Sequence, residues 1–285
     1  MLGYGMVNTT SSSPPPLAIC VAPNGARRTR GEHPALPITS EEIGRTAAAC
    51  AEVGAGMIHL HVRDLAGRHS LDAHHYREAI VAIRREAGPD LAIQITTEAM
   101  GIYTPAQQRM LLRDLRPEAA SVALCELIPD AREEVETAAL YVWALETGIG
   151  LQHILYSANE AERFVALARR GVVPEDRPHA LFVLGRYTTG QRSSPRDVTP
   201  FLVAWPEDWP WSVCAFGQQE ALCLTAAVAL GGHVRTGFEN NIHRPDGTVA
   251  WDNAESVRRI VAVASAAGRD RADPMTTRQI FNIAP

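Results

Sequence analysis

Residues 57–97 read MIHLHVRDLAGRHSLDAHHYREAIVAIRREAGPDLAIQITT and place two short apolar runs on either side of one amphipathic stretch. The runs 57–63 and 91–97 are rich in Ile, Leu and Val, and their length is typical of buried strands. Between them, residues 74–87 repeat apolar side chains at the three- and four-residue spacing of a helix. The stretch therefore predicts two parallel strands joined by a helix.

The same alternation continues along the chain. Thr104-Pro105 is a typical helix start, with a capping residue followed by proline in the first turn. Further strands are expected at 17–23, 119–127, 150–157, 180–186, 211–216 and 233–238, each followed by a helical stretch. About eight such units predict a closed (β/α)8 TIM barrel, and an open doubly wound sheet is the main alternative.

The 285 residues, 46 % of them hydrophobic, are expected to form one barrel domain over residues 16–285. Residues 1–15, rich in Ser, Thr and Pro, predict a disordered leader. A formal charge of −5 argues against nucleic-acid binding, and no apolar stretch is long enough for a membrane span. The five cysteines lack a CxxC spacing and no secretory signal is evident, so a cytoplasmic protein with reduced thiols is expected.

The sequence contains no lysine, so all 27 of its Lys and Arg residues are arginine. This excludes mechanisms that need a lysine nitrogen. Schiff-base aldolases, pyridoxal-phosphate enzymes, P-loop nucleotide hydrolases and carbamylated-lysine hydrolases belong to that group.

His59 and His61 stand two positions apart on an expected barrel strand, so both side chains should point into the barrel mouth. Glu239, just beyond the eighth strand, is the best third ligand, because barrel closure brings it to the same rim. Packing of the histidines, and a salt bridge from Glu239 to Arg63 or Arg235, are the structural alternatives. A His2Glu set with an open position suits catalytic zinc, while Mn, Fe and Ni remain open.

Polar residues also end other strands, where TIM-barrel enzymes carry their chemistry. Gly185, Arg186 and Gly190 in LGRYTTG could form a loop that receives a phosphate group. The other polar strand-end residues are Asn24, Arg27, Arg28, Thr96, Thr97, Glu98, Ser121, Glu126 and His153.

At these residues the chain resembles the β-keto acid cleavage enzymes, typified by 3-keto-5-aminohexanoate cleavage enzyme. The motifs that carry the resemblance are NGARRT, HPALPIT, AGMIHLHVRDLAGRHS, IQITTEA, RPEAASVAL, LFVLGR, GGHVRTGFENN and NAESV, which span nearly the whole chain. The resemblance implies a zinc barrel, usually a homo-oligomer (a dimer or tetramer), that converts a β-keto acid and acetyl-CoA into acetoacetate and a new acyl-CoA. By motif, the zinc ligands match His59, His61 and Glu239, the active-site arginine matches Arg235, and substrate contacts match Thr96, Thr97 and Ser121.

Three positions depart from the family pattern. Asn240 stands where typical members carry an acid implicated in proton transfer, and an amide cannot take that proton. Glu98 is the nearest replacement base by motif. Two glutamates that recognise the amino-keto acid correspond to Arg27 and His153, so a substrate with a neutral or anionic tail is expected.

Three other functions remain open from the sequence. A mononuclear metal hydrolase also uses an HxH pair, although normally on the first barrel strand with an aspartate at the last. A metal aldolase working without CoA would fit the same ligands. A metal-binding relative that lost activity with the change to Asn240 is the third.

Overall fold

The computed structural model describes residues 14–284, so most of the predicted leader 1–15 lies outside the described residues. Eight parallel strands close a barrel in the order β1-β10-β9-β8-β7-β6-β5-β2. The predicted (β/α)8 barrel is confirmed. The barrel strands are β1 (Ile19–Val21), β2 (Met57–Leu60), β5 (Ala92–Thr96), β6 (Ala119–Ala123), β7 (Gly150–Leu155), β8 (His179–Leu184), β9 (Trp211–Ala215) and β10 (His233–Thr236).

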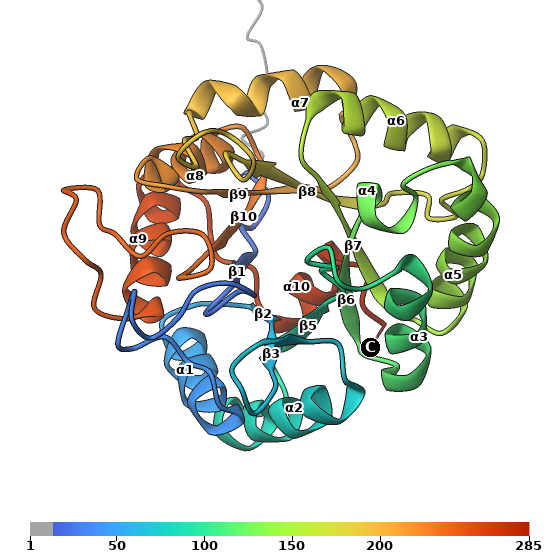
Figure 1. Cartoon of the computed structure of the whole chain (residues 1–285). Coiled ribbons are helices and arrows are strands. Elements are labelled where there is room, and N and C mark those ends of the chain that lie inside the picture. The colour runs from blue at the N-terminus through green and yellow to red at the C-terminus, as the bar shows by residue number, and fades with distance from the viewer. Residues whose placement is uncertain (1–13, 285) are drawn as a thin grey trace, which may run out of the picture.

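Most of the helices surround the barrel as an outer ring (Figure 1). The α-helices of the described residues are α1 (Ser40–Glu52), α2 (Ala73–Ala87), α3 (Pro105–Leu115), α4 (Leu124–Leu127), α5 (Glu134–Glu146), α6 (Ala158–Arg169), α7 (Val198–Ala204), α8 (Glu220–Ala229), α9 (Asn253–Ala266) and α10 (Pro274–Ile280), of which α10 is not part of the ring. No helix in the described part of the chain is long and apolar enough to cross a membrane.

Local sequence fixes several helix starts. Thr39 and Thr104 each form a capping box, with Glu42 and Gln107 respectively, so that backbone donors of the first turn are satisfied. Pro105 occupies the first turn of α3, where a missing N–H costs nothing. These starts set how each helix returns the chain to the next strand.

The main hydrophobic core lies between the barrel and the helices. Alternate strand residues such as Ile58, Leu60 and Ile95 face outward into this layer and are fully buried. A smaller cluster includes the first residues of several strands, such as Met57 and Ala92, packed with Phe281 and Ile283 of the C-terminal segment. The C-terminal segment that includes α10 therefore packs against the amino-terminal end of the barrel, and α10 is visible near the centre of the ring in Figure 1.

Two elements differ from the expected strands. The run 57–63 is interrupted at His61, and its last residues form β3 (Val62–Arg63), which pairs with β4 (His69–Ser70) as a separate antiparallel hairpin. The run 119–127 ends as a strand at Ala123, after which α4 begins. Apolar runs alone could not locate these breaks, because buried apolar residues lie on both sides of each break.

Candidate metal centre and active site

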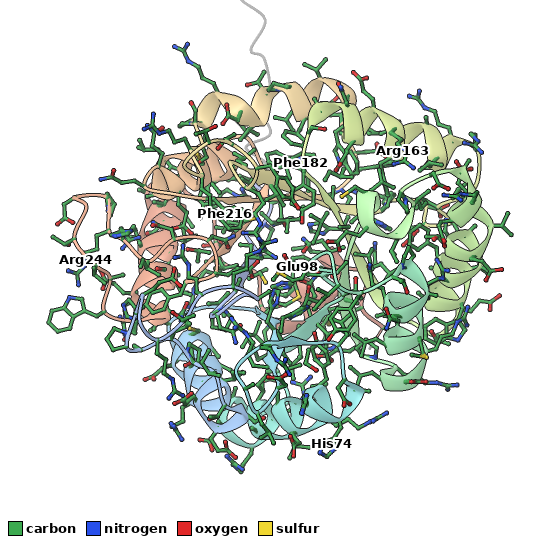
Figure 2. The ribbon with its side chains drawn as sticks, in the orientation of Figure 1. His74, Glu98, Arg163, Phe182, Phe216 and Arg244 are labelled. Carbon is green, nitrogen blue, oxygen red and sulfur yellow. The ribbon has the colours of Figure 1, made fainter. Side chains whose placement is uncertain are left out.

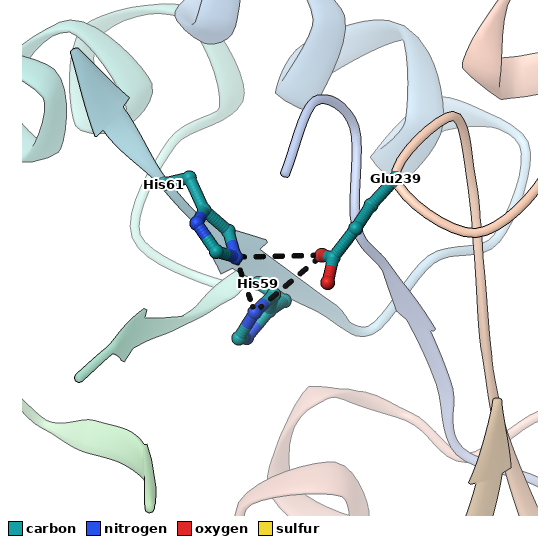
Figure 3. A group of neighbouring side chains, drawn as sticks. All are labelled: His59, His61 and Glu239. Carbon is teal, nitrogen blue, oxygen red and sulfur yellow. Dashed lines mark hydrogen bonds and ion pairs between the residues drawn. The ribbon is translucent and has the colours of Figure 1, made fainter. Parts of the chain in front are cut away.

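His59, His61 and Glu239 converge at the carboxyl end of the barrel. The Nε2 atoms of the two histidines are 3.1 Å apart, and Glu239 Oε2 lies 3.6 Å from His59 Nε2 and 3.5 Å from His61 Nε2 (Figure 3). Oε2 is buried and accepts no hydrogen bond from any described residue. Two imidazole nitrogens and an unpartnered carboxylate oxygen, all within 4.8 Å of one another, form a donor set that fits a zinc ion.

The three candidate ligands come from two segments of the fold. His59 lies on β2, His61 lies in the break just beyond it, and Glu239 lies in the turn after β10. β1 pairs with both β2 and β10, which brings these two segments to one rim although they are far apart in sequence. Gly25 approaches the Glu239 side chain so closely that a Cβ there would lie 2.5 Å from Glu239 Cγ, and its φ of +64° also favours glycine.

The surrounding charges favour the protonation states that a metal needs. Burial, followed by the charge of Arg235, holds the pKa of His59 well below its usual value, so the ring is neutral. Burial alone would raise the pKa of Glu239, but the positive charge of Arg235, together with the neighbouring imidazoles, holds it well below its usual range. Arg235 Nη2 also donates to Glu239 Oε1 at 3.1 Å. A neutral imidazole and an ionised carboxylate are the forms that bind a divalent cation.

A pocket opens directly over these three side chains. Its polar wall includes Thr96, Ser121 and Arg235, and its apolar wall includes Ile154 and Phe216. The cavity itself is small, about 20 Å³, and it shares four wall residues with a neighbouring cavity of about 190 Å³. The structure thus brings two of the three predicted polar substrate contacts next to the candidate metal ligands.

Glu98 lies between the metal ligands and Arg186. Its Oε1 accepts from Arg186 Nη2 at 3.1 Å, and its Oε2 is 3.9 Å from His61 Nδ1. Glu98 lies near the middle of the barrel mouth in Figure 2, and it lines both the pocket and a neighbouring cavity. A carboxylate in this position can reach a molecule bound in the pocket beside the candidate metal ligands.

The neighbouring cavity, which we call the vestibule, is bordered by three guanidinium groups. Arg27, Arg28 and Arg186 line it together with Asn24, Gly25, Ala26, Glu32, Glu98, Gln191, Phe216 and Glu239. Arg28 Nη1 donates to Glu32 Oε1 at 3.0 Å, whereas Arg27 is exposed to solvent. Arg186 is likewise paired with Glu98, so Arg27 is the vestibule guanidinium that has no ion pair with any described residue, and it is the group that could meet an anion there.

Of the three residues of the predicted phosphate loop, only Arg186 lines the pocket or the vestibule. Arg186 reaches both cavities and lies over the Phe216 ring at 4.9 Å. Gly185 and Gly190 line neither cavity, and their φ angles of +77° and +71° allow the turns of this loop.

His153 lies away from the pocket, contrary to the expectation that it faces the substrate. Gln152 and Ile154 point into the barrel, so the alternation of β7 turns His153 outward. Its ring packs 4.5 Å from that of Phe164, and its Nε2 is 3.4 Å from Glu175 Oε1.

Thr97 and Asn240 are also absent from the pocket wall. Thr97 Oγ1 donates to the Ser121 carbonyl at 3.1 Å, which ties β5 to β6. Asn240 is fully buried, and its side-chain amide has no hydrogen-bond partner among the described residues.

Two site residues received no role from the sequence. Glu126 lines the pocket and accepts from the Ala99 N–H at 2.9 Å, and burial raises its pKa to about 7. Gln94 Oε1 lies 2.8 Å from Nδ1 of His59, one of the candidate metal ligands. The available signal was in each case a polar residue inside an apolar run, which does not by itself say what the side chain touches.

Comparisons with known proteins identify relatives of this chain. A family model described as beta-keto acid cleavage enzyme matches residues 16–283. A 3-keto-5-aminohexanoate cleavage enzyme of Fusobacterium nucleatum is 31 % identical over 274 residues, covering 94 % of this chain and 98 % of the relative. A 3-oxoadipate:acetyl-CoA acetyltransferase of Cupriavidus necator is 27 % identical, covering 94 % of this chain and 95 % of the relative.

A solved structure of ObcA, in a ternary complex with a C4-CoA adduct and oxalate, superposes with a TM-score of 0.70 at 17 % identity. The superposition covers 87 % of this chain and 67 % of ObcA, and at that identity it bears on the fold alone. The family match extends over nearly all of the barrel and includes the three converging ligands. The chain belongs to the β-keto acid cleavage enzyme family.

Proposed function

We propose that this protein is a zinc-dependent enzyme that converts a β-keto acid and acetyl-CoA into acetoacetate and a new acyl-CoA. The observation that carries the proposal is the convergence of His59, His61 and Glu239 beneath a pocket that also contains Glu98. The names of the relatives, which include 3-oxoadipate:acetyl-CoA acetyltransferase, supply the reaction class.

Zinc held by these three residues would act as a Lewis acid that stabilises negative charge on the keto and carboxylate oxygens of the substrate. Glu98 takes the proton from the carbon between the two carbonyl groups. Arg235 holds Glu239 ionised and oriented through the 3.1 Å hydrogen bond. Thr96 and Ser121 provide hydroxyl groups to the substrate from the pocket wall.

The remaining steps need no protein nucleophile. The carbanion attacks the thioester carbon of acetyl-CoA and expels the CoA thiolate, which then attacks the original keto carbon. Cleavage of the adjacent carbon–carbon bond yields the new acyl-CoA and the acetoacetate carbanion, which recovers the proton from Glu98. Burial raises the pKa of Cys20 to about 12 and that of Cys214 to about 11, so these nearby thiols stay protonated and the CoA thiolate is the nucleophile.

The vestibule suggests how the β-keto acid is held. Arg27 at its exposed edge favours a neutral or anionic tail on the β-keto acid. Arg186 donates to Glu98 Oε1 at 3.1 Å beside the reacting carbon, and the phosphates of CoA lie a full pantetheine arm away from its thioester, so Arg186 orients Glu98 rather than meeting a CoA phosphate. We further propose a homo-oligomer, a dimer or tetramer, and a reducing cytoplasmic setting that fits the five free cysteines.

The test is direct. Zinc-loaded protein is incubated with acetyl-CoA and β-keto acids bearing cationic, neutral or anionic tails, and acyl-CoA and acetoacetate are followed by mass spectrometry. Both products are expected from a neutral or anionic substrate, and the Glu239→Gln variant should lose them together with bound zinc. Cleavage without acetyl-CoA would indicate a metal aldolase or hydrolase instead, and no product from any substrate in the zinc-bound protein would contradict the proposal.

A further inference from the structure

A line of buried polar side chains crosses the inside of the barrel below the candidate metal centre. His59 Nδ1 lies 2.8 Å from Gln94 Oε1, and Gln94 Nε2 donates to Gln152 Oε1 at 3.1 Å. Gln152 Nε2 donates to Ser212 Oγ at 3.3 Å, and Ser212 Oγ lies 2.8 Å from His179 Nε2. TIM-barrel interiors are normally filled by branched apolar side chains, so a continuous polar line calls for an explanation.

The far end of the line fixes the direction of every hydrogen bond. His179 Nδ1 lies 2.9 Å from the Ile280 carbonyl, which can only accept, so Nδ1 carries the proton. Burial lowers the pKa of His179 to about 4, so its Nε2 is unprotonated and accepts from the Ser212 hydroxyl. Ser212 Oγ then accepts from Gln152, and each amide in turn presents its oxygen towards His59.

The end of the line that is nearest the candidate metal centre determines the tautomer of His59. Because Gln94 presents an oxygen, His59 must donate from Nδ1, which leaves the Nε2 lone pair facing His61 and Glu239. If the Gln94 amide turned over, its oxygen would face the Gln152 oxygen across 3.1 Å, and its NH2 group would face His59 Nδ1. That arrangement would favour the wrong tautomer.

We propose that Gln152, Ser212 and His179 are positioning residues that hold the Gln94 amide in one orientation and thereby keep His59 Nε2 free to bind the metal ion. This inference rests on the metal centre of the proposed function. The line has a rigid far anchor, because the His179 ring stacks on Phe281 at 4.3 Å beside the C-terminal segment that packs under the barrel. It acts on His59 alone, since His61 Nδ1 has no hydrogen-bond partner among the described residues.

The test measures zinc affinity, with a chromogenic chelator as competitor, rather than turnover. Ser212→Ala removes the acceptor of Gln152 and the donor to His179. Mutating the direct partner of a metal-binding histidine typically costs about 10- to 100-fold in metal affinity, and Ser212 lies two hydrogen bonds beyond that partner, so we expect the zinc Kd to rise about 10-fold. Val213→Ala, at a buried neighbour that is not part of the line, should leave the Kd within about threefold. Ser212→Thr, which keeps the hydroxyl, should restore most of the affinity.

A background variant separates this role from a general loss of structure. Gln94→Glu places an acceptor at His59 Nδ1 in either orientation of the side chain, so adding Ser212→Ala to it should change the Kd less than about threefold. If Ser212→Ala does not fold, as judged by circular dichroism, Gln152→Leu interrupts the line one residue nearer the metal and takes its place.

The possible outcomes separate the two proposals. If wild-type protein fails to bind one zinc ion in a Glu239-dependent manner, the metal centre of the proposed function is wrong. If wild type binds zinc and the variants interrupted at Ser212 or Gln152 bind it equally well, the positioning role is wrong. An equal loss of affinity in the Gln94→Glu background would also overturn it, because the fault would then lie in the fold.

Discussion

Replacing Glu98 with glutamine isolates proton transfer from the other properties of the pocket. The amide has the same shape as the carboxylate and can still accept from Arg186 at the 3.1 Å position, but it cannot take a proton at neutral pH. Loss of a general base typically costs about 10²- to 10⁴-fold in rate, or roughly 3–5 kcal/mol in the barrier. We expect kcat to fall on that scale with little change in KM.

The assay follows acyl-CoA formation by mass spectrometry at saturating acetyl-CoA, with bound zinc measured in the same samples because Glu98 Oε2 lies 3.9 Å from His61 Nδ1. Glu126→Gln is the comparison variant, since among the described residues Glu126 is the one further carboxylate of the pocket wall that is not a candidate metal ligand, and the loss of activity should stay below about tenfold. A Glu98→Gln enzyme that retains a third or more of wild-type kcat at full zinc occupancy would refute the assignment of Glu98 as the base. Equal losses in both variants would show that pocket charge, not proton transfer at Glu98, is responsible.

Further predictions concern specificity, a second base and stability. Arg27→Glu should lower kcat/KM for a β-keto acid with a carboxylate tail and raise it for one with an amino tail; parallel changes for the two substrates would contradict the role of the vestibule. Because Asn240 does not line the pocket, adding Asn240→Asp to Glu98→Gln should not restore activity, and a tenfold recovery would identify position 240 as a base after all. Burial raises the pKa of Glu220 from 4.5 to about 7 despite hydrogen bonds from Thr236 and Asn241, so its contribution to stability is complete below pH 4.5 and is lost as pH rises through 7. This corresponds to at most about 3 kcal/mol, and urea unfolding at pH 5 and pH 8 should show a smaller stability difference in Glu220→Gln than in wild type.

The order of strands and helices could be predicted from the sequence, because each of these elements depends mainly on residues that are close together in the chain. Apolar runs such as 91–97 and helix starts such as Thr104-Pro105 are local signals, and the closed barrel follows from their regular repetition. Two of the candidate metal ligands could also be identified from the sequence, because His59 and His61 are only two residues apart. Glu239 could be added because barrel closure must bring the last strand back beside the first.

Other features depended on which face of a strand a residue occupies and where the strand ends. His153 is a histidine like two of the candidate metal ligands, yet its position on β7 turns its side chain towards the helices. The break at His61 and the packing of α10 beneath the barrel were likewise not evident from the apolar pattern. A shift of one residue exchanges the two faces of a strand, so small errors in strand placement reverse such assignments.

The sequence by itself determined the barrel, the absence of lysine chemistry and the three candidate metal ligands, because patterning and composition are properties of the chain alone. Only the tertiary structure decided that Glu98 lies beside Arg186 and His61, and that Gln94, Gln152, Ser212 and His179 form one line. These contacts join residues that lie on, or just beyond, different strands. They are set by the alignment of strands around the closed barrel, to which no local sequence signal corresponds.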